Sequence, residues 1–191
     1  PYGHSKAAVE RMFSDLAASE SCWRIACLRY FNPVGAHPSG RIGENPSGIP
    51  NNLFPFVSQV AVGKREKLKV FGGDWPTSDG SAVRDYIHVM DLAEGHKAAL
   101  RTLLSEDPQL LTVNLGSGHG YSVLEVVEAF QQASGHPIPY IFAERRSGDA
   151  AISVADASVA AQRLQWRTKH SLEEMCSHSL EWQKKNPRGF E

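Results

Sequence analysis

Residues Trp23–Phe31 read WRIACLRYF, and this stretch decides the fold. In a strand with one face in water, apolar side chains alternate with polar ones, and in this stretch they do not. A short apolar run of this kind is typical of a strand buried on both faces, as in a parallel sheet. Up to about Ser19, the preceding apolar side chains follow helical spacing: Val9, Met12, Phe13, Leu16 and Ala17. A helix that leads into such a strand favours an α/β fold.

The rest of the chain continues to alternate helices and strands. Further strands are predicted at 68–71, 83–89, 111–115 and 140–143, and helices at 51–63, 91–103, 122–135, 157–164 and 172–185. Asp91 is the predicted N-cap of its helix. Ser122 with Glu125, and Ser171 with Glu174, form the capping-box pattern that begins two others. This order predicts a mostly parallel sheet.

Two long segments interrupt the alternation. Residues 32–50 are rich in Gly, Pro, Asn and Ser, and residues 72–82 are a second loop. Long loops in compact domains often carry binding residues. We therefore expect a ligand site near these segments.

Composition excludes several classes of protein. The 191 residues carry 20 Lys and Arg against 21 Asp and Glu, so the basic excess typical of nucleic-acid binding is missing. No apolar run approaches the roughly 20 residues of a membrane span, and no signal peptide opens the chain. The 3 cysteines, Cys22, Cys27 and Cys176, have neither a disulfide pattern nor metal spacing, and we expect all of them to be packing residues. The absence of a disulfide pattern predicts a cytoplasmic protein. The histidines form no ligand motif, so no metal site is predicted.

Tyr2 and Lys6 are candidates for chemistry. Their spacing places both side chains on one face of the predicted helix, one turn apart. A lysine ammonium near a phenol lowers the pKa of the phenol. A tyrosine tuned in this way can act as a general base toward an alcohol.

Several motifs in sequence order extend this hypothesis. They are YGHSK (2–6), RYFNPVGAHPSG (29–40), PNNL (50–53), RDYIHVMD (84–91), NLGSGHGYSV (114–123) and RRSGD (145–149). Together they resemble the extended short-chain dehydrogenase/reductase family. Among its members, the pattern is most similar to those that interconvert UDP-glucose and UDP-galactose.

The resemblance implies a fold and a division of the chain. Residues 1–32 would be the end of a Rossmann-like, NAD-binding domain, and residues 33–191 a smaller mixed α/β domain that binds a UDP-sugar. Residues 83–104 would pack back on the Rossmann-like part. The family's cofactor-binding glycine loop would precede Pro1, so we expect a piece of a longer protein, inactive alone and a homodimer when complete.

The resemblance also implies residue roles. Tyr2 would take the proton of the sugar 4-hydroxyl, and Lys6 would hold the nicotinamide ribose. Phe31 and Pro33 would lie beside the nicotinamide of NAD. The implied substrate-binding residues are Asn32, Asn52, Lys69, Val70, Phe71, Arg84, Arg146, Asp149 and Ser153. Among them, Arg84 and Arg146 would clamp the diphosphate, a task that suits planar guanidinium groups.

Two features have a separate interpretation. In the resembled family, the position that Ser153 matches lines the pocket for the sugar 2-substituent, and the small serine side chain implies that N-acetylated UDP-sugars are also accepted. Gly116, Gly118 and Gly120 lack the spacing of a dinucleotide-binding loop, so we interpret them as a structural turn.

Alternatives remain open. One is another nucleotide-sugar epimerase or dehydratase, acting on UDP-glucuronate or a dTDP-sugar. A second is a module that binds a nucleotide sugar without catalysis. A third is a structural or partner-binding α/β domain.

Overall fold

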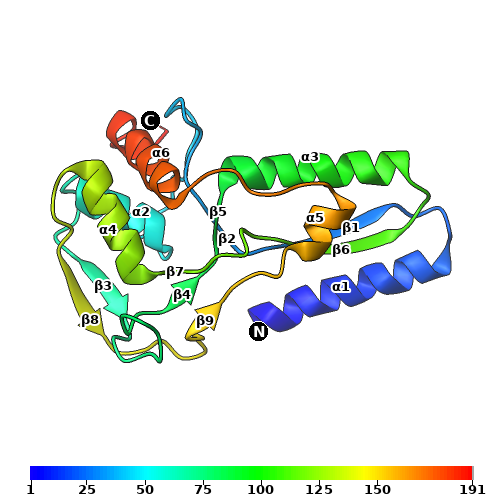
Figure 1. The fold of residues 1–191 in the computed structure, drawn as a ribbon, viewed down its shortest axis with the longest axis horizontal. Helices are drawn as coiled ribbons and strands as arrows, with labels where there is room; N and C mark the ends of the chain where they lie inside the picture. Colours follow the sequence, from blue (N-terminus) through cyan, green and yellow to red (C-terminus); the bar gives the residue numbers. More distant parts are fainter. Residues whose placement is uncertain (191) are drawn as a thin grey trace.

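The computed structural model describes residues 1–190 and shows a mixed α/β protein (Figure 1). The helices are α1 (Tyr2–Ser19), α2 (Leu53–Ala61), α3 (Val89–Ser105), α4 (Val123–Ser134), α5 (Ser158–Arg163) and α6 (Leu172–Lys185). The strands are β1 (Ile25–Tyr30), β2 (Asn32–Val34), β3 (Leu68–Phe71), β4 (Val83–Arg84), β5 (Tyr86–His88), β6 (Leu110–Leu115), β7 (Tyr121–Ser122), β8 (Tyr140–Ala143) and β9 (Ile152–Ser153).

One part of the molecule is built on β1 and β6. These strands pair in parallel, from Ile25 opposite Leu110 to Tyr30 opposite Leu115, and lie between α3 and α1 in Figure 1. A core of aliphatic residues and Trp166 joins α3, β6 and α5. The parallel pairing predicted for the WRIACLRYF stretch is confirmed.

The burial predicted for β1 is wrong for this structure. Only Cys27 of the strand is buried, and β6 is the only strand that pairs with β1 among the described residues. The helix α1 that lies against the pair has no buried residue, and it exposes Val9, Met12 and Phe13.

A second core holds the other part together. It is formed by apolar residues of α2, α4 and α6 around β3, with Phe54 and Phe130 in edge-to-face contact at its centre. β3 pairs in parallel with β8, over the residue ranges predicted for both strands. The capping boxes of α4 and α6 are confirmed, as is Gly135, which ends α4 in the left-handed conformation.

Short strands connect the two parts. β2 pairs in parallel with β5, and β4 lies between β7 and β9. β2 falls in a segment predicted as a loop, and no strand was predicted at β7 or β9, because two or three residues give no periodic signal. The strand predicted at 83–89 is divided at Asp85 into β4 and β5.

The predicted N-cap of α3 is also wrong. His88 caps the helix, with its Nδ1 accepting a hydrogen bond from the Met90 N–H. The predicted cap, Asp91, lies inside the first turn, where it is buried. Its carboxylate accepts hydrogen bonds from the backbone N–H groups of Lys169 and His170 instead.

The cysteines differ in burial. All cysteines are free, and Cys27 and Cys176 are buried, but Cys22 is exposed, so its prediction as a packing residue is wrong. Within residues 1–190, no helix is long and apolar enough to cross a membrane.

The helix α3 packs against β1. The boundary between two domains near residue 32 stays a prediction.

Candidate functional site

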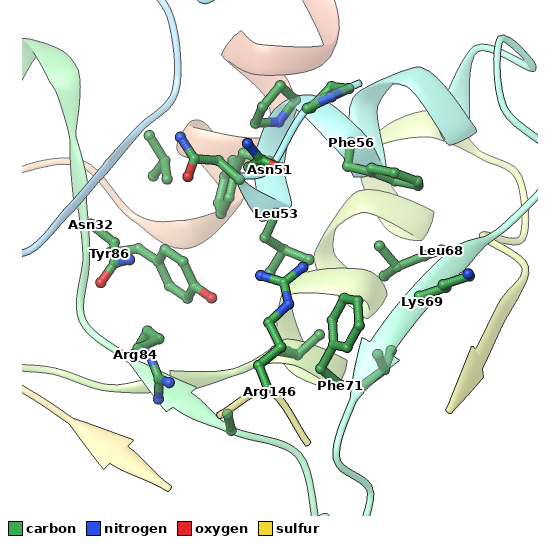
Figure 2. Close-up of a pocket in the computed structure, with 18 of the residues that line it drawn as sticks. Asn32, Asn51, Leu53, Phe56, Leu68, Lys69, Phe71, Arg84, Tyr86 and Arg146 are labelled. Carbon is green, nitrogen blue, oxygen red and sulfur yellow. The ribbon is translucent and has the colours of Figure 1, made fainter. Parts of the chain in front are cut away.

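A cavity of about 650 Å³ lies between β2, β3, β4 and the start of α2 (Figure 2). Most of the predicted site residues line it: Phe31, Asn32, Pro33, Asn52, Lys69, Val70, Phe71, Arg84, Arg146 and Asp149. These residues come from motifs far apart in the sequence. The structure therefore brings together a set that the sequence could only propose.

The first wall of the cavity forms where the chain leaves β1. The Phe31 N–H still donates to Leu115 of β6, and the next N–H, of Asn32, donates to Asp85 between β4 and β5. The chain thus changes partner strands between two consecutive residues. Ligands of α/β proteins bind beyond the carboxyl ends of strands, and this point follows the end of β1.

Two arginines line the cavity. The Arg84 Nη1 donates hydrogen bonds to the carbonyls of Val83 (2.8 Å) and Ala150 (2.7 Å), and its Nη2 lies 3.9 Å from Asp149 Oδ1. The Arg146 guanidinium carbon lies 3.8 Å from the centroid of the Phe71 ring. Figure 2 shows Arg146 between Phe71 on one side and Tyr86 and Arg84 on the other. This arrangement can bind a group with several anionic oxygens.

The opposite wall combines polar and apolar groups. Asn52 is the N-cap residue of α2, but its side chain makes no capping hydrogen bond, and its Nδ2 donates to Glu44 Oε1 at 3.3 Å. In Figure 2 the Lys69 ammonium points away from Arg146, so Lys69 offers its backbone to the cavity. Hydrogen-bonding backbone beside an aromatic ring suits a planar base.

Several lining residues are not among the predicted site residues, for example Glu44, Arg65 and Tyr86. Tyr86 belongs to the quoted RDYIHVMD motif; it is buried, burial raises the pKa of its phenol, and its hydroxyl points toward the cavity in Figure 2. Arg65 donates to Gln59 Oε1 and stacks on Phe56. Glu44 lies in a loop where no periodicity marks it.

Tyr2 and Lys6 form a pair outside the cavity lining. The Lys6 Nζ lies 5.4 Å from the centroid of the Tyr2 ring, so the one-turn spacing brings the ammonium to the phenol as predicted. The Tyr2 side chain is 76% exposed. Its hydroxyl is therefore free to meet a large ligand or another part of a longer chain.

Ser153 is the other predicted site residue outside the lining. It lies on β9 opposite Arg84 of β4, and its carbonyl accepts a hydrogen bond from the Asp85 N–H. The structure therefore places Ser153 beside a cavity residue and not in the cavity wall.

The glycine turn after β6 is closed by the protein itself. The Asp85 carboxylate accepts hydrogen bonds from the N–H groups of Ser117, Gly118 and Ala155. A Cβ at Gly116 would lie 2.7 Å from an Asp85 carboxylate oxygen, so only glycine fits there. The position that a phosphate takes in a nucleotide-binding loop is filled by this carboxylate, which supports the interpretation as a structural turn.

His88 is likewise part of the framework. It is fully buried, stacks on His170 at 4.1 Å between centroids, and its Nε2 lies 3.0 Å from His178 Nδ1. In the part of the chain that the structure describes, no group of His, Cys, Asp or Glu is arranged to hold a metal ion.

Comparison with known proteins identifies the family. Residues 1–116 match the NAD dependent epimerase/dehydratase family. The chain belongs to this family. The match includes the Tyr2–Lys6 pair and Arg84, and Arg146 and Asp149 lie beyond it.

Individual relatives cover the whole chain. UDP-glucose 4-epimerase of Bacillus subtilis is 56% identical over 190 residues, which are 100% of this chain and 56% of that protein. The mouse (Mus musculus) UDP-glucose 4-epimerase is 55% identical and covers 100% of this chain and 54% of its own length. A crystal structure of UDP-glucose 4-epimerase from Bifidobacterium longum, in complex with NAD+ and UDP, has a TM-score of 0.95 and 50% identity. The matched region covers 100% of this chain and 56% of the Bifidobacterium longum chain. The chain thus spans little more than half the length of these relatives.

Proposed function

We propose that the whole protein interconverts UDP-glucose and UDP-galactose and that the cavity described above binds the UDP-sugar. The observation that carries the proposal is that Arg84 and Arg146 both line a cavity that asparagines also line. Guanidinium groups bind paired phosphate oxygens, and the amides of Asn32 and Asn52 offer both donors and acceptors for hydroxyl groups. The similarity to UDP-glucose 4-epimerases over the whole chain supports the same assignment.

The residues at the start of α1 fit a nicotinamide cofactor. The Lys6 ammonium lies over the Tyr2 ring, and both side chains are exposed, so they leave room for a large group. NAD, when bound, supplies reversible hydride acceptance from the sugar C4. Tyr2 Oη would accept the proton of the 4-hydroxyl, and Lys6 would hold the nicotinamide ribose. Phe31 and Pro33, at the strand end, would lie beside the cofactor ring.

Catalysis in this proposal requires a polypeptide of the relatives' length. The cavity is lined by residues within 1–190, but Tyr2 is not among them. This observation favours a second candidate function for the chain by itself: binding a nucleotide sugar without turnover.

Assembly as a homodimer is part of the proposal. The α1 residues Val9, Met12 and Phe13 expose an apolar surface that another chain or another domain can cover. Light scattering on a polypeptide of the relatives' length tests this, and a monomer at all concentrations would contradict it. We also propose a cytoplasmic location, because the cysteines are free.

N-acetylated substrates are a further hypothesis. Ser153 is small and lies opposite Arg84 on the neighbouring strand. Turnover of UDP-N-acetylglucosamine by a polypeptide of the relatives' length is the measurement, and undetectable turnover would sink the idea.

The central experiment is an interconversion assay with UDP-galactose, at the relatives' length and with NAD present. Formation of UDP-glucose is the expected result. Binding of UDP-glucose without conversion would favour the binding module, and conversion of UDP-glucuronate alone would favour the alternative epimerase.

A further inference from the structure

The end of α6 anchors the loop between β2 and α2. Trp182 is buried, and its Nε1 donates a hydrogen bond of 3.0 Å to the Glu44 carbonyl. A Cβ at Gly43 would lie 2.3 Å from Trp182 Cγ, so the loop backbone lies directly on the indole. Asn186 Nδ2 donates to the Gly40 carbonyl at 2.9 Å, and Lys185 Nζ donates to the Ser39 carbonyl at 3.1 Å. A segment without regular structure is thereby fixed to a helix.

This loop delivers a carboxylate to Asn52. Asparagine at an N-cap ordinarily accepts a hydrogen bond from the helix backbone, but the Asn52 side chain makes no such bond. Its Nδ2 donates to Glu44 Oε1 instead, and both residues line the cavity. Because an ionised carboxylate only accepts hydrogen bonds, Glu44 selects the amide orientation in which the NH₂ group faces it. The carbonyl oxygen of Asn52 is then left as an acceptor for a ligand hydroxyl.

We propose that Glu44 is a positioning residue for Asn52 and that Trp182 holds Glu44 in place. The inference rests on the proposed function, because it assigns Asn52 a contact with the UDP-sugar. It explains why a helix at the C-terminal end of the chain matters to a site built mainly from earlier segments. It also explains why the side chain of Asn52, the N-cap residue of α2, makes no capping hydrogen bond.

Titration calorimetry with UDP-glucose tests the proposal on this chain. Glu44→Ala removes the acceptor, and we expect about fivefold to tenfold weaker binding, the loss of roughly one net hydrogen bond. Glu44→Gln keeps an acceptor oxygen, and we expect affinity within about twofold of the wild type. Equal affinity of the wild type and Glu44→Ala would overturn the inference while leaving the proposed function standing.

A double variant separates positioning from general stabilisation. Trp182→Phe keeps most of the packing and removes the indole N–H, and we expect about threefold weaker binding. Because both residues act through Asn52, Glu44→Ala with Trp182→Phe is expected to bind no more weakly than Glu44→Ala alone. Additive losses would contradict the proposal.

Trp166→Phe is the matched control. Trp166 is also buried, and its Nε1 also donates to a backbone carbonyl, that of Asp91, at 3.1 Å, but it is not among the cavity residues. We expect a lower melting temperature with unchanged affinity. A change in affinity as large as that of Trp182→Phe would mean that loss of stability alone explains both, and it would overturn the inference. Absence of UDP-glucose binding by the folded wild type would overturn the proposed function and the inference together.

Discussion

The Arg146 guanidinium carbon lies 3.8 Å from the centroid of the Phe71 ring, inside the cavity. The preceding residue, Arg145, repeats this contact outside it, with its guanidinium carbon 4.0 Å from the centroid of Trp75 and its Nε 2.8 Å from Asp74 Oδ1. Two adjacent arginines thus have similar aromatic partners and different surroundings.

This pair provides an internally controlled prediction. Arg146→Ala removes a cation that we assign to the diphosphate, and we expect UDP to bind about 2 kcal/mol more weakly by titration calorimetry. Arg145→Ala removes an equally stacked cation that does not line the cavity, and its effect on affinity is expected to be below about 0.5 kcal/mol. Equal losses in both variants would mean that the charge acts at long range and not as a clamp.

A second prediction concerns the proton acceptor. In a polypeptide of the relatives' length, Tyr2→Phe is expected to lower kcat by about 10²-fold or more, because general base catalysis contributes that much. The affinity for UDP is expected to stay unchanged, since Tyr2 does not line the cavity. His4→Ala, at an exposed position on the same helix, is the control. Activity of Tyr2→Phe near that of the wild type would refute the assigned role.

Features that depend on neighbouring residues in the chain could be predicted from the sequence. Capping boxes at Ser122 and Ser171 fixed the start of two helices, and a one-turn spacing placed Lys6 over Tyr2. Most of the residues that line the cavity could be predicted from the family motifs, because each motif is a contiguous stretch of sequence. These signals need no knowledge of how distant segments meet.

Features that depend on contacts between distant segments could not be predicted from the sequence. His88, and not the predicted Asp91, is the N-cap of α3. The Asp91 carboxylate instead accepts hydrogen bonds from the N–H groups of Lys169 and His170, which lie far along the chain. Glu44 was missed because only its approach to Asn52 and Trp182 gives it a role. No periodicity records contacts between a loop and a C-terminal helix.

The buried histidines predict a pH-dependent stability. Burial, followed by the neighbouring His170 and His178, lowers the pKa of His88 to about 4, against the opposing effect of Asp91 and Glu174. The folded protein therefore binds fewer protons than the unfolded chain between the folded and unfolded pKa values. The free energy of unfolding is expected to be constant above about pH 6.5 and to fall by roughly 3 kcal/mol as the pH drops toward 4.

Urea titrations at pH 7.5 and pH 5 measure this slope. His88→Asn keeps an acceptor for the Met90 N–H and removes the titrating ring, so its slope is expected to be shallower than that of the wild type. His136→Asn, at an exposed position, is expected to keep the slope. An unchanged slope in His88→Asn would assign the pH dependence to other groups, such as His178, whose pKa burial also lowers.

Asp85 gives a prediction about the framework. Its buried carboxylate accepts from backbone N–H groups of the glycine turn and of Ala155, which follows β9. Asp85→Asn turns one acceptor into a donor that faces these N–H groups, and we expect the free energy of unfolding to fall by about 2–3 kcal/mol in urea titrations. Asp107→Asn, on the exposed surface, is expected to change it by less than about 0.5 kcal/mol. A variant of Asp85 as stable as the wild type would show that the turn does not depend on the carboxylate.

The central claim is that the cavity beside Arg84 binds a UDP-sugar. Titration calorimetry of UDP-glucose into the wild-type chain and Arg84→Ala, with folding of both checked by circular dichroism, tests it most directly. We predict one-to-one binding by the wild type and an affinity at least about tenfold lower in the variant, since a charge-assisted contact to phosphate is lost. Absence of binding by the folded wild type, or equal affinity in the two proteins, would contradict the account.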